Sequence, residues 1–230
     1  MRTPLLSALI LAVALGNPNS SNANTVYALG VGFSVDANTL DAINAATTFY
    51  NLAGTDHGAS LPSSLSGATI NINQGGSLLL SGATAKTWQS STDSANSVTL
   101  FYRVYESGTA LASRPSFSSY NILYSNQWQP DANINKYWTS TSSPGTVNLL
   151  TGLTAGTIAA PRNYTIELYG MAAFTWSNGG NSGSYNSFAN NGGNPNNYTT
   201  QFQLVPEPSS ASLLTFALSG LLALRRRRQA

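Results

Sequence analysis

Val98-Thr-Leu-Phe-Tyr-Arg-Val-Tyr-Glu106 alternates its side chains with the two-residue period of a β-strand. One face carries Val98, Leu100, Tyr102 and Val104, and the other carries Thr99, Phe101, Arg103 and Tyr105. An apolar face backed by an amphipathic one is typical of a strand that covers a core on one side. The stretch therefore predicts a central strand of a β-sandwich.

The same alternation covers most of the chain between Asn24 and Leu204. Residues 198–204 place Tyr, Thr, Phe and Leu on one face and Thr, Gln and Gln on the other. Further strands are expected at Ala68–Asn73, Leu78–Leu80, Tyr120–Ser125 and Tyr164–Gly170. Turn sequences separate the strands, at residues 74–76, 107–108, 143–145 and 154–156. Short strands with such turns predict a mainly β fold, an antiparallel β-sandwich of immunoglobulin-like or jelly-roll-like type.

Two stretches depart from strand alternation. Asp36–Tyr50 places Leu40, Ile43 and Thr47 at helical spacing, which predicts a short helix. Residues 178–197 contain eight Asn and five Gly, which predicts the mobile tip of a long hairpin. The amides of such a tip suit hydrogen bonds to sugars or a hard cation, and the alternative is a loop that only meets solvent.

The central domain is almost uncharged. Charged residues make up 8% of the chain and hydrophobic residues 42%, whereas soluble domains average roughly 25% charged residues. Between residues 24 and 205 there are five cations and seven anions, a net charge of −2. Without a basic stripe to neutralise phosphates, nucleic-acid binding is not expected. There is no cysteine, which excludes disulfides and cysteine nucleophiles.

The first residues, Met1–Ala23, are typical of a secretory signal peptide. Arg2 supplies a positive start, and Leu5–Leu15 is apolar except for Ser7. Small residues allow cleavage after Gly16 or after the preferred Ala23. The alternative is a buried N-terminal helix, which an apolar run of this length behind one arginine does not favour.

The last residues form three parts in order. Val205-Pro206-Glu207-Pro208 comes first, and its prolines keep the backbone extended. Residues 209–224 are uncharged and, as a transmembrane helix, cover about 24 Å, slightly less than a hydrocarbon core of about 30 Å. The membrane stop Arg225-Arg226-Arg227-Arg228 follows. Because positive charge stays on the cytoplasmic side, the helix is expected to begin outside the membrane.

This ending closely resembles the PEP-CTERM sorting domain of Gram-negative bacteria. The resemblance covers residues 205–230, with Val205, Pro206, Glu207 and Pro208 as the sorting motif. It implies that an exosortase, a membrane transpeptidase, cuts at the motif and releases or transfers the protein to the cell surface. It also implies an association with exopolysaccharide. A plain C-terminal membrane anchor is the alternative, although an anchor needs no Pro-Glu-Pro motif.

Catalytic and metal-binding patterns are weak. The single histidine, His57, follows Asp56 in a turn-like stretch, and adjacent residues rarely form a catalytic pair. Residues 131–135 begin like a calcium loop, but Lys136 and Ser142 stand where Gly and Glu are needed. We therefore expect no catalytic residues, no metal and no cofactor. A glycan-active enzyme would need two carboxylates facing each other in a cleft.

The aromatic residues are better candidates for a binding surface. Trp128 and Trp138 flank a polar stretch that is expected to be a loop, where exposed rings would stack on sugars. The alternative is that they fill the core, as most aromatics of a β-sandwich do.

The sequence thus predicts a signal peptide at 1–23, a β-sandwich domain at 24–204 and a sorting and anchoring segment at 205–230. The expected function is that of a noncatalytic exported protein of the cell surface or extracellular matrix, anchored in the inner membrane through residues 209–224 before processing. A carbohydrate-binding module associated with exopolysaccharide is the alternative. An exposed pair of coplanar tryptophans would favour that alternative.

Overall fold

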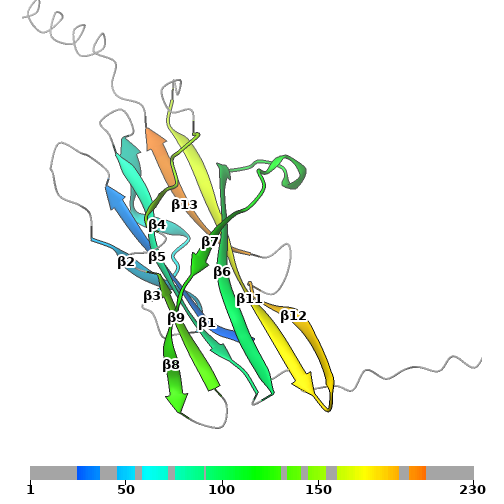
Figure 1. Cartoon of the computed structure of the whole chain (residues 1–230). Helices are drawn as coiled ribbons and strands as arrows, with labels where there is room; N and C mark the ends of the chain where they lie inside the picture. The colour runs from blue at the N-terminus through cyan, green and yellow to red at the C-terminus, as the bar shows by residue number, and fades with distance from the viewer. Residues whose placement is uncertain are drawn as a thin grey trace, which may run out of the picture.

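The chain folds into two β-sheets (Figure 1). The computed structural model describes residues 25–36, 46–54, 59–71, 76–90, 92–130, 134–140, 145–153, 160–191 and 197–205. Among these residues the only helical element is the single 3₁₀ turn η1 (Leu111–Ser113). The prediction of a mainly β protein is confirmed.

The first sheet has seven strands. Its order is β3 (Ala59–Ser60), β2 (Thr48–Ala53), β1 (Thr25–Asp36), β5 (Ser77–Trp88), β9 (Ile134–Ser140) and β8 (Tyr124–Pro130), and β10 (Val147–Asn148) also pairs with β5. Its pairs are antiparallel except for β2 and β3, which run parallel.

The second sheet has six strands. Its order is β4 (Ser64–Asn71), β13 (Tyr198–Val205), β11 (Arg162–Asn178), β6 (Asp93–Glu106) and β7 (Ser118–Ile122), and β12 (Asn181–Ala189) pairs with β11. Strands β4 and β13 are parallel. Both sheets are therefore mixed, and the prediction of purely antiparallel sheets is wrong at one edge of each sheet.

The two sheets share one hydrophobic core. Strand alternation directs every second side chain of β6, β11 and β13 into it, among them Leu100, Ile166 and Phe202, which are all at most 2% exposed. Leu29 and Phe33 of β1 enter the same core from the first sheet. The inward face that alternation predicted for residues 98–106 is buried at Val98 and Leu100 and half-buried at Tyr102 and Val104.

The expected helix at Asp36–Tyr50 is wrong at its C-terminal end. Thr48, Phe49 and Tyr50 begin β2 and pair with β1. A Thr-Thr-Phe-Tyr run has the β-branched and aromatic side chains that suit a pleated sheet, and pairing with β1 outweighs the helical spacing. Residues 37–45 lie outside the described residues.

The expected strand Tyr120–Ser125 is two strands in different sheets. β7 ends at Ile122 in the second sheet and β8 begins at Tyr124 in the first, so the chain changes sheet at Leu123. The hydroxyl of Ser140 joins the two sides of this crossing, because it accepts from the Leu123 amide at 2.9 Å and donates to the Asn121 carbonyl at 3.1 Å.

The expected mobile loop at residues 178–197 is wrong for its first half. β11 and β12 form a long hairpin at one end of the second sheet (Figure 1), and β6 pairs with the other side of β11 as far as Trp176. Its turn is Gly179-Gly180, whose φ angles of 58° and 84° suit a tight hairpin turn without steric cost. Tyr185 stacks on Phe174 across the hairpin, with ring centroids 5.3 Å apart. Residues 192–196 lie outside the described residues.

Gly170 marks a close approach of the two sheets. A Cβ atom at this position of β11 would lie 2.6 Å from Cδ2 of Leu29, which is fully buried in β1. Gly170→Ala is therefore expected to destabilise the fold by about 1–3 kcal/mol through overpacking. The measurement is the midpoint of equilibrium urea unfolding. The double variant with Leu29→Val should lose less than the sum of the single variants, and strict additivity would contradict the contact.

Among the residues that the structure describes, no helix has the length and apolar character needed to cross a bilayer. The expected signal peptide, residues 1–23, and the expected transmembrane helix, residues 209–224, both lie outside this part of the chain.

Candidate functional site

A buried carboxylate lies on the outer face of the second sheet. Glu167 follows the alternation of β11 away from the core, yet its side chain is 2% exposed. Directly opposite in β6 is Arg103, whose guanidinium binds it in a two-pronged geometry. Nε donates to Oε2 and Nη2 donates to Oε1, both at 2.9 Å. Such fork-to-fork pairs are among the strongest hydrogen bonds between side chains.

Three more donors complete the shell of Glu167. Oε2 accepts from the Tyr105 hydroxyl at 3.0 Å and from Nη1 of Arg114 at 3.1 Å. Oε1 accepts from Nδ2 of Asn197 at 2.7 Å. Burial by itself raises the pKa of Glu167, but hydrogen bonds from Asn197, Arg103 and Tyr105, with the Arg103 charge, outweigh it and lower the pKa below its usual value. The carboxylate is thus held ionised and saturated, which suits a structural anchor better than a general base.

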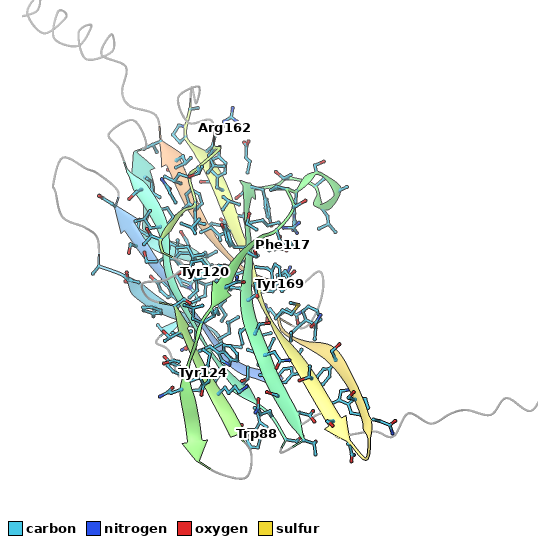
Figure 2. All side chains as sticks on the ribbon, viewed as in Figure 1. Trp88, Phe117, Tyr120, Tyr124, Arg162 and Tyr169 are labelled. Carbon is cyan, nitrogen blue, oxygen red and sulfur yellow. The ribbon has the colours of Figure 1, made fainter. Side chains whose placement is uncertain are left out.

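Aromatic rings cover this ion network. The guanidinium of Arg103 lies 4.2 Å from the ring centroid of Phe117. Phe117 meets Tyr169 edge-on at 4.9 Å, and Figure 2 shows the two residues side by side. Tyr169 in turn stacks on Phe101 at 4.8 Å with a 10° interplanar angle. Because these two rings face each other, they do not form the flat, coplanar platform on which a sugar chain stacks.

The network fixes the segment that joins β6 to β7. Arg114 follows η1 in this segment, and its Nε also donates to the Thr109 carbonyl at 3.3 Å. Nη1 of Arg103 donates to the Pro115 carbonyl at 3.3 Å. Burying these charges costs desolvation energy. The structural result is that the chain from residue 109 to residue 115 is held in place.

A groove of about 530 Å³ lies beside this segment. The ladder between β6 and β7 ends at the pair Tyr102 and Ser118, so β7 departs and the edge of β6 opens there. One wall is Tyr102, Arg103 and Val104. Residues 115–118 form the second wall, and residues 146–153 form the third.

The third wall is attached to the first sheet. β10 pairs with β5 through Val147 and Leu80, and the Leu149 amide donates to the Leu78 carbonyl at 2.8 Å. The Tyr120 hydroxyl reaches across from β7 and donates to the Gly145 carbonyl at 3.1 Å. The groove is therefore bounded by segments that are each held by hydrogen bonds to a sheet.

No carboxylate is among the described residues that line the groove. Among the described residues of its walls, the one charged side chain is that of Arg103, which is paired with Glu167. The described residues also contain no cluster of three or more His, Asp or Glu side chains that would hold a metal ion. Chemically, the groove offers hydroxyl, amide and apolar groups rather than acid–base groups.

The two tryptophans that the sequence singled out lie on the neighbouring strands β8 and β9, which also take up most of the polar segment that was expected to be a loop between them. Trp138 of β9 is 4% exposed, and its Nε1 donates to the Thr87 hydroxyl at 3.0 Å. It belongs to the core and has no ring face free for stacking on a sugar, because β-strand alternation turns it inward. The backbone of Trp128 lies in β8, and its side chain is outside the described residues.

Most residues of the weak catalytic and metal-binding patterns lie outside the residues that the structure describes. Residues 55–58, with His57, and residues 131–133 are not described. Asn135, which would be the fifth residue of the calcium loop, is 1% exposed in β9, and its Oδ1 accepts from the Gln89 amide at 3.4 Å. An inward-facing Asn135 does not serve as a ligand of an exposed loop.

Of the expected sorting motif, Val205 is described and forms the last residue of β13, paired with Asn71 of β4. Pro206, Glu207, Pro208 and Arg225, Arg226, Arg227 and Arg228 lie outside the described residues.

Sequence reasoning did not single out Glu167, Arg103 or Arg114. The available signal was a pair of opposite charges, Arg103 and Glu167, each inside a strand whose other charged residues lie at the strand ends. In a chain with 8% charged residues, a charge at such a position predicts a partner on a neighbouring strand. Comparison of the chain with protein-family models, curated proteins and solved structures finds no match.

Proposed function

We propose that this chain is a noncatalytic exported protein of the cell surface or extracellular matrix. Its domain, residues 24–204, is a β-sandwich that is carried through the inner membrane and anchored there by residues 209–224. An exosortase-type transpeptidase then cuts at Val205-Pro206-Glu207-Pro208 and sends the domain to the surface or the medium. The order of motif, apolar stretch and arginine cluster at the end of the chain supports this route.

The observation that supports the proposal is the position in the fold of Val205, the first residue of the motif. β13 ends at Val205, at the end of the second sheet where β11 begins, because Leu204 pairs with Arg162. The other end of β11 forms the hairpin with β12, so Val205 lies at the opposite end of the second sheet from that hairpin. A cut after Val205 would therefore leave every strand that the structure describes in the released domain.

The test is intact mass and cell fraction of the protein from its native host. We expect a surface or medium species that lacks residues 1–23 and everything beyond the motif. The variant with Pro206→Ala, Glu207→Ala and Pro208→Ala should instead remain in the inner membrane with its C-terminus intact. Ser209→Ala with Ser210→Ala, just beyond the motif, is the matched control and should be processed normally. If the triple variant shows the mass and location of the unchanged protein, the sorting proposal fails.

A second candidate function is a carbohydrate-binding module associated with exopolysaccharide. One observation favours it, the groove between β6, residues 115–118 and residues 146–153. Its volume of about 530 Å³ lies in the range of roughly 300–1,000 Å³ that is usual for small-molecule sites.

A further inference from the structure

We infer that the groove binds an uncharged saccharide, one or two rings of a neutral glycan. The inference rests on the second candidate function, carbohydrate binding, and is independent of sorting at the C-terminal motif. Three properties of the groove carry it: fixed walls, no unpaired charge among its described lining residues, and a mixture of hydroxyl and apolar groups.

The walls are fixed before any ligand arrives. Arg103 holds the Pro115 carbonyl while it binds Glu167, and Arg114 holds the chain just before it. On the opposite side, the amide of Leu149 and the ladder at Val147 tie the third wall to β5. A site whose backbone is already ordered loses less conformational entropy on binding, which raises the affinity for a small ligand.

The charge of the groove selects against ionised ligands. Nε and Nη2 of Arg103 donate to Glu167, and Nη1 donates to the Pro115 carbonyl. Two of the five N–H groups of the guanidinium are left, but its positive charge is balanced by the Glu167 carboxylate. A uronate or phosphate group would have to compete with Glu167, which five hydrogen bonds hold in place. The part of the groove that the structure describes has no second cation to offer such a group. This unfavourable competition gives the site a preference for neutral sugars.

The polar and apolar groups match the two kinds of surface that a sugar ring has. Ser116, Ser118, Thr146 and Thr151 line the groove, and their hydroxyls have no protein partner among the described residues. Each such hydroxyl both donates and accepts, as sugar hydroxyls do. Tyr102 and Leu153, which are half-buried, supply apolar surface for the C–H faces of the ring. A purely apolar ligand would leave these hydroxyls without partners, at a cost in free energy.

Ser118 and Ser119 provide a matched pair of variants. Both are exposed and adjacent in β7, but Ser118 lines the groove whereas Ser119 pairs with Phe101 and points to the outer face. Ser118→Trp should fill the groove, and Ser119→Trp should add the same ring outside it. Thr151→Trp, in an exposed turn on the opposite wall, blocks the groove without altering a sheet.

The experiment is affinity electrophoresis of the full chain in detergent, in gels that contain dextran, galactomannan or mixed-linkage glucan, with alginate as the polyuronate probe. We expect retardation by at least one neutral polymer, at least tenfold weaker apparent affinity for Ser118→Trp and Thr151→Trp, and unchanged affinity for Ser119→Trp. Circular dichroism identifies any variant that fails to fold, and the groove variant that does fold then tests the inference.

The inference is overturned if no neutral polymer retards the chain, if alginate retards it as strongly, or if folded groove variants bind normally. The electrophoresis does not test processing or location of the protein, so its result leaves the sorting proposal unchanged.

Discussion

Replacing Glu167 with alanine is expected to destabilise the domain by about 3–5 kcal/mol, because it leaves buried cations without their counter-charge. Arg103 is 11% exposed and Arg114 is 26% exposed at the side chain. Neither has another carboxylate partner among the described residues. Tyr105 and Asn197 also lose the acceptor that they share. The measurement is the free energy of unfolding from equilibrium urea titrations followed by circular dichroism.

The matched control is an ion pair at the surface of the second sheet. Nη1 of Arg162 and Oε2 of Glu106 are 3.2 Å apart, and their side chains are 48% and 51% exposed. Solvent screens such a pair, so Glu106→Ala should cost no more than about 1 kcal/mol. Equal losses in Glu167→Ala and Glu106→Ala would show that the buried network does not stabilise the fold.

The same network predicts how stability depends on pH. Folding lowers the pKa of Glu167, with burial opposing the change and the hydrogen bonds from Asn197, Arg103 and Tyr105 outweighing it. A carboxylate of this kind contributes its full stability above its unfolded-state pKa of about 4.3, and that contribution is lost as the pH falls through the folded-state pKa. Between about pH 5 and about pH 3, Glu167→Gln should therefore lose less stability than the unchanged protein. Parallel pH profiles of the two proteins would contradict the assignment.

Replacing Trp138 with alanine is expected to destabilise the domain by about 3–5 kcal/mol, the usual cost of removing a buried aromatic ring. The ring is 4% exposed and meets Tyr124 edge-on at 5.6 Å. Trp138→Phe keeps part of the volume but removes the donor to the buried Thr87 hydroxyl, which should cost about 1–3 kcal/mol. Urea unfolding of the three proteins by circular dichroism gives both differences.

Leu123→Ala is the control for Trp138, because Leu123 is apolar but 47% exposed at the crossing between the sheets. We expect a change within about 0.5 kcal/mol, as for most surface substitutions. If Trp138→Ala leaves stability unchanged, the ring does not belong to the core, and a role in ligand stacking would regain support.

The sequence predicted the strands well where burial on one face imposed a period of two. Residues 98–106 lie in β6, and residues 198–204 lie in β13 with Phe202 and Leu204 buried. The turn at Ser107-Gly108 is present, with Gly108 at a φ of 91°. A local pattern suffices here because neighbouring residues of a strand face opposite sides whatever the strand pairs with.

The amino-acid composition of residues 178–191 led to a wrong prediction, because the turn sequence within them was the more informative signal. Residues 178–191 are rich in Asn, Gly and Ser, and on that ground they were expected to be part of a mobile tip. The Gly-Gly pair at 179–180 was the stronger signal, because two positive φ angles produce a tight hairpin and bring β12 onto β11. Trp176 then covers Gly183 on the opposite strand, a cross-strand contact that compensates for the missing side chain.

By itself, the sequence determined the strand periodicity, the near-neutral surface and the set of side chains that face the core, since each of these depends only on residue type and on neighbours along the chain. The tertiary structure decided the register that sets Arg103 opposite Glu167, 64 residues away. It also decided the parallel edges at β3 and β4, the burial of Trp138 and the position of the groove. Register and strand order arise from packing between distant segments. The alternation of a strand shows which of its faces is apolar, but it does not show which other strand it pairs with or in which register. The buried ion network and the groove beside it therefore became visible only once the two sheets were assembled.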